Sequence, residues 1–105
     1  MVEKIGFVVV YRQPDDKEKF DERYQKHLKL FEEHAAKFVE SASVIKVISD
    51  DVDRDLYQIA TVYLKKGIDL NTAMNSPEMK ILVDDVLDFV PEDKFKVFPI
   101  SEKVY

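Results

Sequence analysis

The chain has 105 residues and a mass of 12.3 kDa, enough for one domain but not for a second hydrophobic core. Its 21 acidic and 16 basic residues are interleaved, with a formal charge of −5, so we expect no basic face for nucleic acid. The absence of cysteine excludes disulfides, thiolate nucleophiles and cysteine-ligated metals.

The first apolar run, residues 5–11, predicts a strand because it is β-branched and aromatic. It is too short to span a membrane, and it is followed by Arg12 and a Pro-Asp-Asp turn instead of a cleavage site. We therefore expect a cytoplasmic protein with no membrane partner.

Residues 17–38 predict a helix, preceded by a turn whose aspartate can act as N-cap. Apolar side chains recur there at spacings of three and four, which is typical of a helix lying on a core. The predicted stripe consists of Phe20, Tyr24, His27, Leu28, Phe31, Ala35 and Phe38.

The second half of the chain predicts two strands, a helical region and a last strand. The strands cover residues 43–48 and 56–64, joined as a hairpin by a charged turn. The helical region extends from 67 to 90 and is interrupted at 75–78, where Ser76 can cap a new helix that begins with Pro77.

The last strand covers residues 95–100, and Pro99 indicates that it lies at an edge or carries a bulge. The resulting order, β-α-β-β-α-β, predicts an α+β, ferredoxin-like fold over the single domain 1–105. In that fold two helices cover one face of a four-stranded antiparallel sheet.

The predicted strands are apolar on both faces, whereas a sheet with one face in water should alternate. Residues 7–11 are all apolar or aromatic, and the tail after residue 100 is too short to cover an open face. Such a face predicts a homodimer, packed sheet against sheet about a two-fold axis. The expected alternation puts Leu56, Ala60, Val62 and Leu64 on one face of the third strand, and Tyr57, Ile59 and Tyr63 on the other.

His27 falls inside the apolar stripe of the first helix, about 20° from Phe20 on a helical wheel. A histidine that points into a cavity between helix and sheet can act as general base, general acid or hydrogen-bond anchor. The alternative is a buried histidine satisfied by a backbone carbonyl, and the pattern leaves both open. Tyr11, Tyr24, Tyr57 and Tyr63 similarly predict either a pocket for a flat aromatic ligand or ordinary packing.

Two candidate metal sites do not hold. His34 follows His27 by two helical turns, too far for both rings to bind one metal without other ligands. The acidic run 51–55 resembles the start of a calcium loop, but Leu56 stands where that loop needs glycine. We interpret the run as a solvated turn and expect neither a metal nor a cofactor.

Two motifs, in chain order, carry a family resemblance. The first is F-x3-Y-x2-H-x2-L from Phe20 to Leu30, after a Val-Val-Tyr-Arg strand, and the second is Ser-Pro-Glu at 76–78 followed by Asp85 and Phe89. The chain thereby resembles EthD-like proteins of the dimeric α/β-barrel superfamily, whose first helix carries His-x-Pro-Leu. Lys29 replaces the family proline, so the helix can continue without a kink. Leu64 stands in place of the family's strand-end phenylalanine.

The resemblance implies a dimer with a cavity between sheet and helices, and it aligns His27 with the family's histidine. Relatives on this fold include cofactor-free monooxygenases, lactone isomerases and haem-handling enzymes. We therefore expect a cofactor-independent oxidoreductase (monooxygenase) or isomerase of a small aromatic or cyclic substrate. The alternative is a non-catalytic dimer that binds a small hydrophobic molecule or is associated with stress. The expected catalytic residues are His27 and Asp85, and the expected substrate-binding residues are Tyr11, Tyr24, Phe31 and Tyr63.

Overall fold

The order of strands and helices is the one that the sequence predicts. The computed structural model describes residues 2–48 and 55–105, so most of the predicted charged turn lies outside the described residues. The elements are β1 (Val2–Arg12), α1 (Lys17–Ala35), β2 (Val39–Lys46), β3 (Leu56–Leu64), α2 (Leu70–Met74), α3 (Pro77–Phe89), a 3-10 turn (Glu92–Lys94) and β4 (Phe95–Val104).

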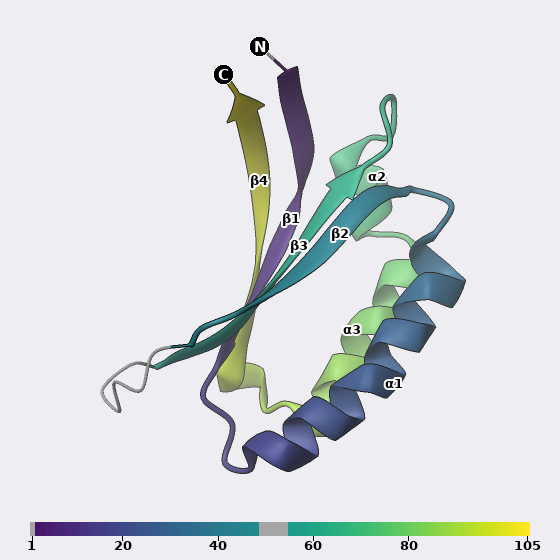
Figure 1. Ribbon diagram of the computed structural model, residues 1–105. Helices are drawn as coiled ribbons and strands as arrows, with labels where there is room; N and C mark the ends of the chain where they lie inside the picture. The colour runs from purple at the N-terminus through teal and green to yellow at the C-terminus, as the bar shows by residue number, and fades with distance from the viewer. Residues whose placement is uncertain (1, 49–54) are drawn as a thin grey trace.

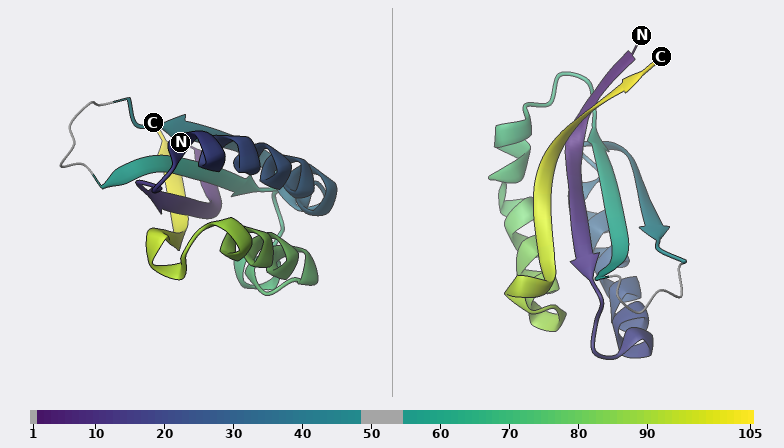
Figure 2. Two further views of the ribbon diagram at one scale, coloured as in Figure 1. Left: turned by 90° about the horizontal axis from the view of Figure 1, so that it is seen from below. Right: turned by 90° about the vertical axis from the view of Figure 1, so that its left-hand side faces the viewer.

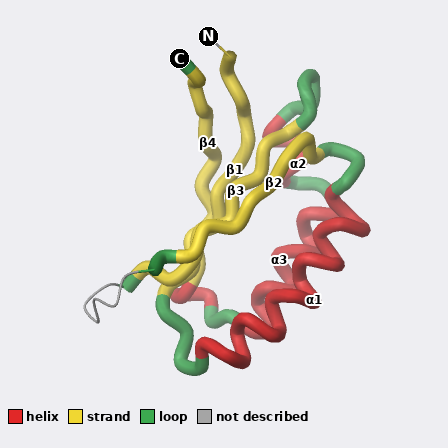
Figure 3. Tube along the Cα trace, viewed as in Figure 1, coloured by secondary structure: helices red, strands yellow, loops and turns green. Residues whose placement is uncertain are grey.

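The four strands form one antiparallel sheet in the order β2-β3-β1-β4. The helices lie together on one face of this sheet and leave the other face open, as Figures 1 and 2 show. The tube in Figure 3 shows the same two layers. This confirms the predicted ferredoxin-like α+β fold, and Pro99 lies in the edge strand β4, as predicted. None of the helices in the described part of the chain is long and apolar enough to cross a membrane.

Local sequence signals set the helix starts. Asp16 caps α1 by accepting a hydrogen bond from the Lys19 amide at 3.1 Å, and Ser76 caps α3 by accepting one from the Met79 amide at 3.2 Å. Pro77 takes the first position of α3, as expected. The strand ends differ more from the prediction: β2 begins at Val39 instead of residue 43, because Val39 and Ser41 pair with the end of β3.

The strand register sorts the apolar side chains between the two faces. Phe7, Val9 and Tyr11 pair with Val62, Ala60 and Gln58, and these residues face the helices. Val8 pairs with Thr61 and Phe98, and this second set faces away from the helices. The apolar residues of the open face include a half-buried or exposed set of six, which are Val8, Val10, Ile45, Ile59, Phe98 and Ile100.

Tyr57 corrects the predicted alternation of β3. Simple alternation places it on the open face with Ile59, but its ring packs edge-on against Phe20 of α1, with centroids 5.4 Å apart. Its hydroxyl donates to Asp21 at 2.8 Å. The pairing of β1 with β3 skips Tyr57 at a bulge, and an extra residue in a bulge is turned away from the regular alternation.

Candidate functional site

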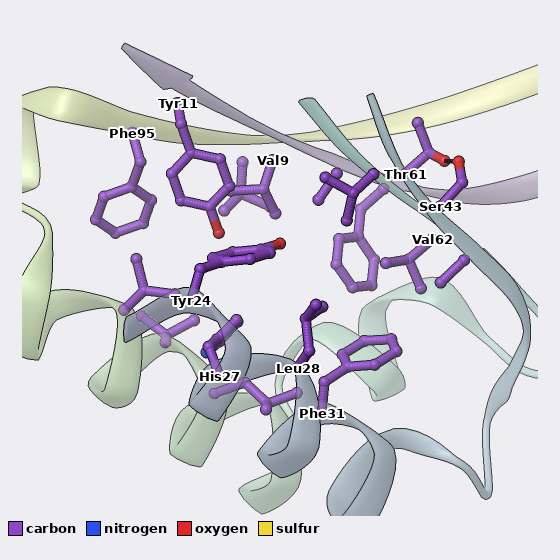
Figure 4. A pocket seen from close by; sticks show the side chains of 18 of the residues that line it. Val9, Tyr11, Tyr24, His27, Leu28, Phe31, Ser43, Thr61, Val62 and Phe95 are labelled. Carbon is purple, nitrogen blue, oxygen red and sulfur yellow. Dashed lines mark hydrogen bonds between the residues drawn. The ribbon is translucent and has the colours of Figure 1, made fainter. Parts of the chain in front are cut away.

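A cavity of about 380 Å3 lies between the sheet and the helices α1 and α3 (Figure 4). Its walls are mostly aliphatic and aromatic, and its volume is typical of small-molecule sites, which span roughly 300–1,000 Å3. The polar residues among those that line it are Tyr11, Tyr24, His27, Glu32, Ser43 and Thr61. The side chains of Ser43 and Thr61 lie on the open face of the sheet, where their hydroxyls hydrogen-bond to each other.

The mouth of the cavity lies between β2 and α1. Ala42, Ser43 and Val44 of β2 line the cavity, yet all three are exposed, with Val44 at 40%. Glu32 of α1 also lines it and is exposed. A ligand therefore reaches the interior past the edge strand, without any need to separate α1 from α3.

His27 is buried at the helix side of this cavity, 7% exposed. Its Nδ1 lies 2.9 Å from Oδ2 of Asp85, a residue of α3. Burial lowers the pKa of the His27 imidazole, and the positive charge of Arg23 lowers it further. The hydrogen bond to Asp85 opposes this shift without cancelling it. The imidazole is thus neutral near pH 7.

Asp85 determines which imidazole nitrogen carries the proton. Hydrogen bonds from Arg23 hold the pKa of the Asp85 carboxyl below its usual value, and the bond to His27 acts in the same direction. An ionised carboxylate can only accept, so the neutral ring donates from Nδ1. Nε2 is left with its lone pair, and no hydrogen bond to it forms within the described residues. His27 is therefore bonded to a carboxylate, and not to a backbone carbonyl.

Tyr11 and Tyr24 form one end of the cavity. Their rings meet edge to face with centroids 5.6 Å apart, and both side chains lie among the residues that line the cavity (Figure 4). Burial raises the pKa of both phenols, in Tyr11 with help from the neighbouring Tyr24 and Asp85. Both hydroxyls therefore keep their protons and can donate hydrogen bonds.

Gln58 is a polar residue that the sequence interpretation missed. It is 1% exposed, pairs with Tyr11 across β1 and β3, and faces the helices beside Tyr24. Its Nε2 is buried and has no hydrogen-bond partner in the part of the chain that the structure describes. The signal was available: Gln58 is the one amide among the inward-facing positions of an otherwise apolar strand.

Five of the six predicted site residues come together. Tyr11, Tyr24, His27 and Phe31 line the cavity, and Asp85 lies directly behind His27. Tyr63 is the exception and corrects the expected set: it is on the open face, and its hydroxyl donates to Glu102. Its neighbours Val62 and Leu64 face the helices, and strand residues alternate, so Tyr63 points away from the cavity.

The described residues contain no cluster of three or more His, Asp or Glu side chains that could hold a metal ion. His34 lies in the last turn of α1 and does not line the cavity.

The chain matches no protein-family model and no curated protein. Its structure is similar to that of an ethyl tert-butyl ether D (EthD) family protein from Bacillus halodurans, with a TM-score of 0.79 and 21% identity over 96% of this chain and 99% of that one. The structure is also similar to that of a DABB family protein with a ferredoxin-like fold from Mesorhizobium loti, with a TM-score of 0.61 and 13% identity over 99% of both chains.

A dimeric ferredoxin-like protein of unknown function from Thermobifida fusca is also similar, with a TM-score of 0.60 and 10% identity over 97% of this chain and 92% of that one. At such identities the similarity establishes the fold, which all three structures share with this chain over nearly its whole length. It does not extend to an activity.

Proposed function

We propose that this protein is an EthD-like enzyme that binds a small aromatic or cyclic molecule in the cavity and acts on it without a cofactor, with His27 as acid and base. The observation that carries the proposal is a neutral imidazole, oriented by Asp85, at the wall of an apolar cavity. The similarity to the EthD family structure supports the family assignment.

The first chemical step is a proton transfer. Nε2 of His27 removes a proton from an acidic C–H bond of the substrate, and the electron pair of that bond remains on the substrate as an enolate. Asp85 stabilises the imidazolium that forms, and the hydroxyl of Tyr11 or Tyr24 donates to the enolate oxygen.

Two reactions can follow from this enolate. An isomerase returns the same proton to a different carbon of the substrate. A monooxygenase uses dioxygen as oxidant and co-substrate: one oxygen atom converts a CH2 group into a carbonyl, and the other leaves as water with the two hydrogens of that group. Both reactions begin with the same proton transfer, so one experiment can test the shared step.

The lining favours a neutral substrate. Glu32 is the one Asp, Glu, Lys or Arg among the lining residues, and the imidazole of His27 is neutral. An anionic substrate would find no cation in the cavity to replace its lost hydration.

We further propose that the protein is a homodimer formed through the open face of the sheet. Ile45 is 49% exposed on that face and Phe98 is 42% exposed, and both belong to the six-residue apolar set defined above. A second copy would remove this surface from water, and the Thermobifida fusca structure, which shares the fold, is described as dimeric.

A deuterium-exchange experiment tests the catalytic proposal. The probe is 2-tetralone, a neutral bicyclic ketone with acidic hydrogens beside its carbonyl, incubated with the protein in D2O and followed by proton NMR. We expect exchange faster than in buffer, and a loss of at least about 100-fold of that enhancement in His27→Ala.

The control is His34→Ala, which removes the other histidine of the same helix outside the cavity and should leave exchange intact. If wild-type protein binds the probe but exchange stays at the buffer rate, or if His27→Ala exchanges as fast as wild type, the catalytic role is wrong.

A non-catalytic role is the second candidate, and one observation favours it. Asp85 ties α1 to α3 through His27 and Arg23, so the same network has a structural use without any reaction. A small-molecule-binding or stress-associated dimer would then bind neutral aromatic probes such as 2-naphthol, measured by calorimetry, with no exchange of 2-tetralone. In that case His27→Ala should change affinity or stability alone.

A further inference from the structure

Arg23 lies on α1 one helical turn before His27, and Asp85 joins the two residues. Nη2 of Arg23 is 2.5 Å from Oδ1 of Asp85, and Nη1 is 3.3 Å from Oδ2. The same Oδ2 accepts the hydrogen bond of His27 at 2.9 Å. One carboxylate is therefore shared by a guanidinium on its outer side and an imidazole on its inner side.

The Arg23 guanidinium also contacts two other residues of α3, Phe89 and Asp88. It stacks on the ring of Phe89, with its central carbon 4.5 Å from the ring centroid, and it contacts Asp88 at 3.4 Å. Phe89 in turn lies against the His27 ring, with centroids 6.1 Å apart. Side-chain exposure falls from 24% in Arg23 to 18% in Asp85 and 9% in His27. The three side chains thus form a chain from the surface to the cavity.

We propose that Arg23 is a positioning residue for His27: acting through Asp85, it keeps the imidazole neutral while the proton stays on Nδ1. The proposal rests on the function proposed above, because it assigns a purpose to a free Nε2 at the cavity. It concerns a residue that never touches the bound molecule.

The reason lies in the balance of charges around the imidazole. A lone buried carboxylate beside His27 would orient the ring but would also draw a second proton onto Nε2, which would remove the base. The positive charge of Arg23 compensates that of Asp85, so that orientation is kept and the second proton is not taken up. The lowered pKa values of both Asp85 and His27 agree with this arrangement.

The titratable groups that face His27 are few. Arg23 and Tyr24 belong to its own helix, Asp85 comes from α3, and Tyr11 of β1 lies across Tyr24. Burial keeps both phenols protonated, so Arg23 and Asp85 are the charges that matter near neutral pH.

The test is an NMR titration of the two histidines in 15N-labelled protein, without any ligand. Long-range 1H–15N correlations report both the titration midpoint and the nitrogen that carries the proton, and His34 serves as internal reference. We expect the wild-type His27 to carry its proton on Nδ1 at pH 7.5. In Arg23→Gln the midpoint of His27 should move upward, whereas that of His34 should not.

Three further variants sharpen the result. Arg23→Met keeps an apolar stem over Phe89 and should give the same upward shift if Arg23→Gln is too unstable to measure. Arg23→Lys restores the charge and should bring the midpoint back toward the wild-type value. Asp88→Asn leaves the pair of Arg23 and Asp85 intact and is the matched control.

A midpoint that is unchanged or lower in the charge-removing variants overturns the proposal, and so does a wild-type ring protonated on Nε2. These outcomes are independent of 2-tetralone exchange. If the His27 midpoints shift as expected but the protein does not accelerate 2-tetralone exchange, the catalytic function is rejected and the role of Arg23 stands.

Discussion

The imidazole Nδ1 of His27 and the carboxylate Oδ2 of Asp85 lie 2.9 Å apart, although the two residues are 58 positions apart in the chain. Each lies inside a helix, His27 in α1 and Asp85 in α3, so the contact depends on how the helices pack against each other. It is also a titratable contact, and the stability of the protein should report on it.

We predict that stability falls between pH 7.5 and 5.5 because of His27. Its folded pKa is lowered from the ordinary value of 6.5, so in this window the unfolded chain binds more protons than the folded one. The stabilisation is complete above about pH 6.5 and is lost as the pH falls. Asp85, whose ordinary value is 3.8, loses its contribution only at lower pH. Urea unfolding of His27→Gln at both pH values should show a smaller loss than wild type.

The matched control for this measurement is His34→Gln, which should keep the wild-type difference between the two pH values. An equal pH dependence in wild type and His27→Gln would contradict the prediction, since it would assign the loss to other groups.

Gln58→Met should stabilise the empty protein by about 1 kcal/mol. The buried Nε2 has no partner within the described residues, and an unmade hydrogen bond costs desolvation that an apolar side chain of similar shape avoids. The control is Gln13→Met, because Gln13 donates to the Leu56 carbonyl at 3.1 Å and its loss should cost about 1 kcal/mol. Thermal unfolding measures both, and a destabilised Gln58→Met would show that the amide has a use in the folded state.

Gly6→Ala should be among the most damaging single changes outside the cavity. A Cβ at this position would lie 1.8 Å from the carbonyl oxygen of Val62, so the backbone of β1 or β3 must move. We expect a loss of ~3 kcal/mol or more in urea unfolding. Gly67→Ala is the comparison: it has open space around it but a φ of 90°, and should cost only about 1–2 kcal/mol. Similar losses in both variants would refute the steric account.

Phe98→Asp should convert the proposed dimer into a monomer. Phe98 lies on the open face beside Val8, and a carboxylate there would be buried without a partner in a sheet-to-sheet interface. Native mass spectrometry should find two chains of 12.3 kDa in wild type and one in the variant. Leu87→Asp is the control, since Leu87 is 46% exposed on α3, on the helix side of the sheet. A monomeric wild type would remove the interface from the proposed function.

Local sequence signals predicted the elements that they control. The bounds of β3 agree with the prediction, because its β-branched and aromatic residues stand between Asp55 and Lys65. The predicted start of β2 was wrong because Glu40 and Ser41 look like loop residues, and the strand extends through them only because Val39 and Ser41 pair with Leu64 and Tyr63 at the end of β3. Tyr57 was placed on the wrong face because a bulge belongs to a pair of strands and leaves no trace in either one alone.

The candidate site was predicted only in part, because contacts between two helices leave no pattern in the sequence of either one. Helical phase placed His27 in the apolar stripe, whereas Asp85 was expected only from the family resemblance, since spacing within α3 cannot reveal a contact with α1. Arg23 was missed because it borders the solvated side of α1 and acquires its partners from α3. Tyr63 was included for its chemistry, although its strand position already pointed it away from the helices.

The two walls of the cavity differ in how freely they can change. His27 belongs to a helix of 19 residues, about 28 Å long, that continues without a break through Lys29 and is tied to α3 by Asp85. β2 is an edge strand that pairs with β3, and Ala42 and Val44 are its two residues whose side chains face the mouth of the cavity. Larger residues at these two positions would narrow the entrance while the polar network stays as it is. Among close homologues, substitutions that change the size of the accepted molecule should therefore accumulate in β2. The helix residues that carry the chemistry should stay the same.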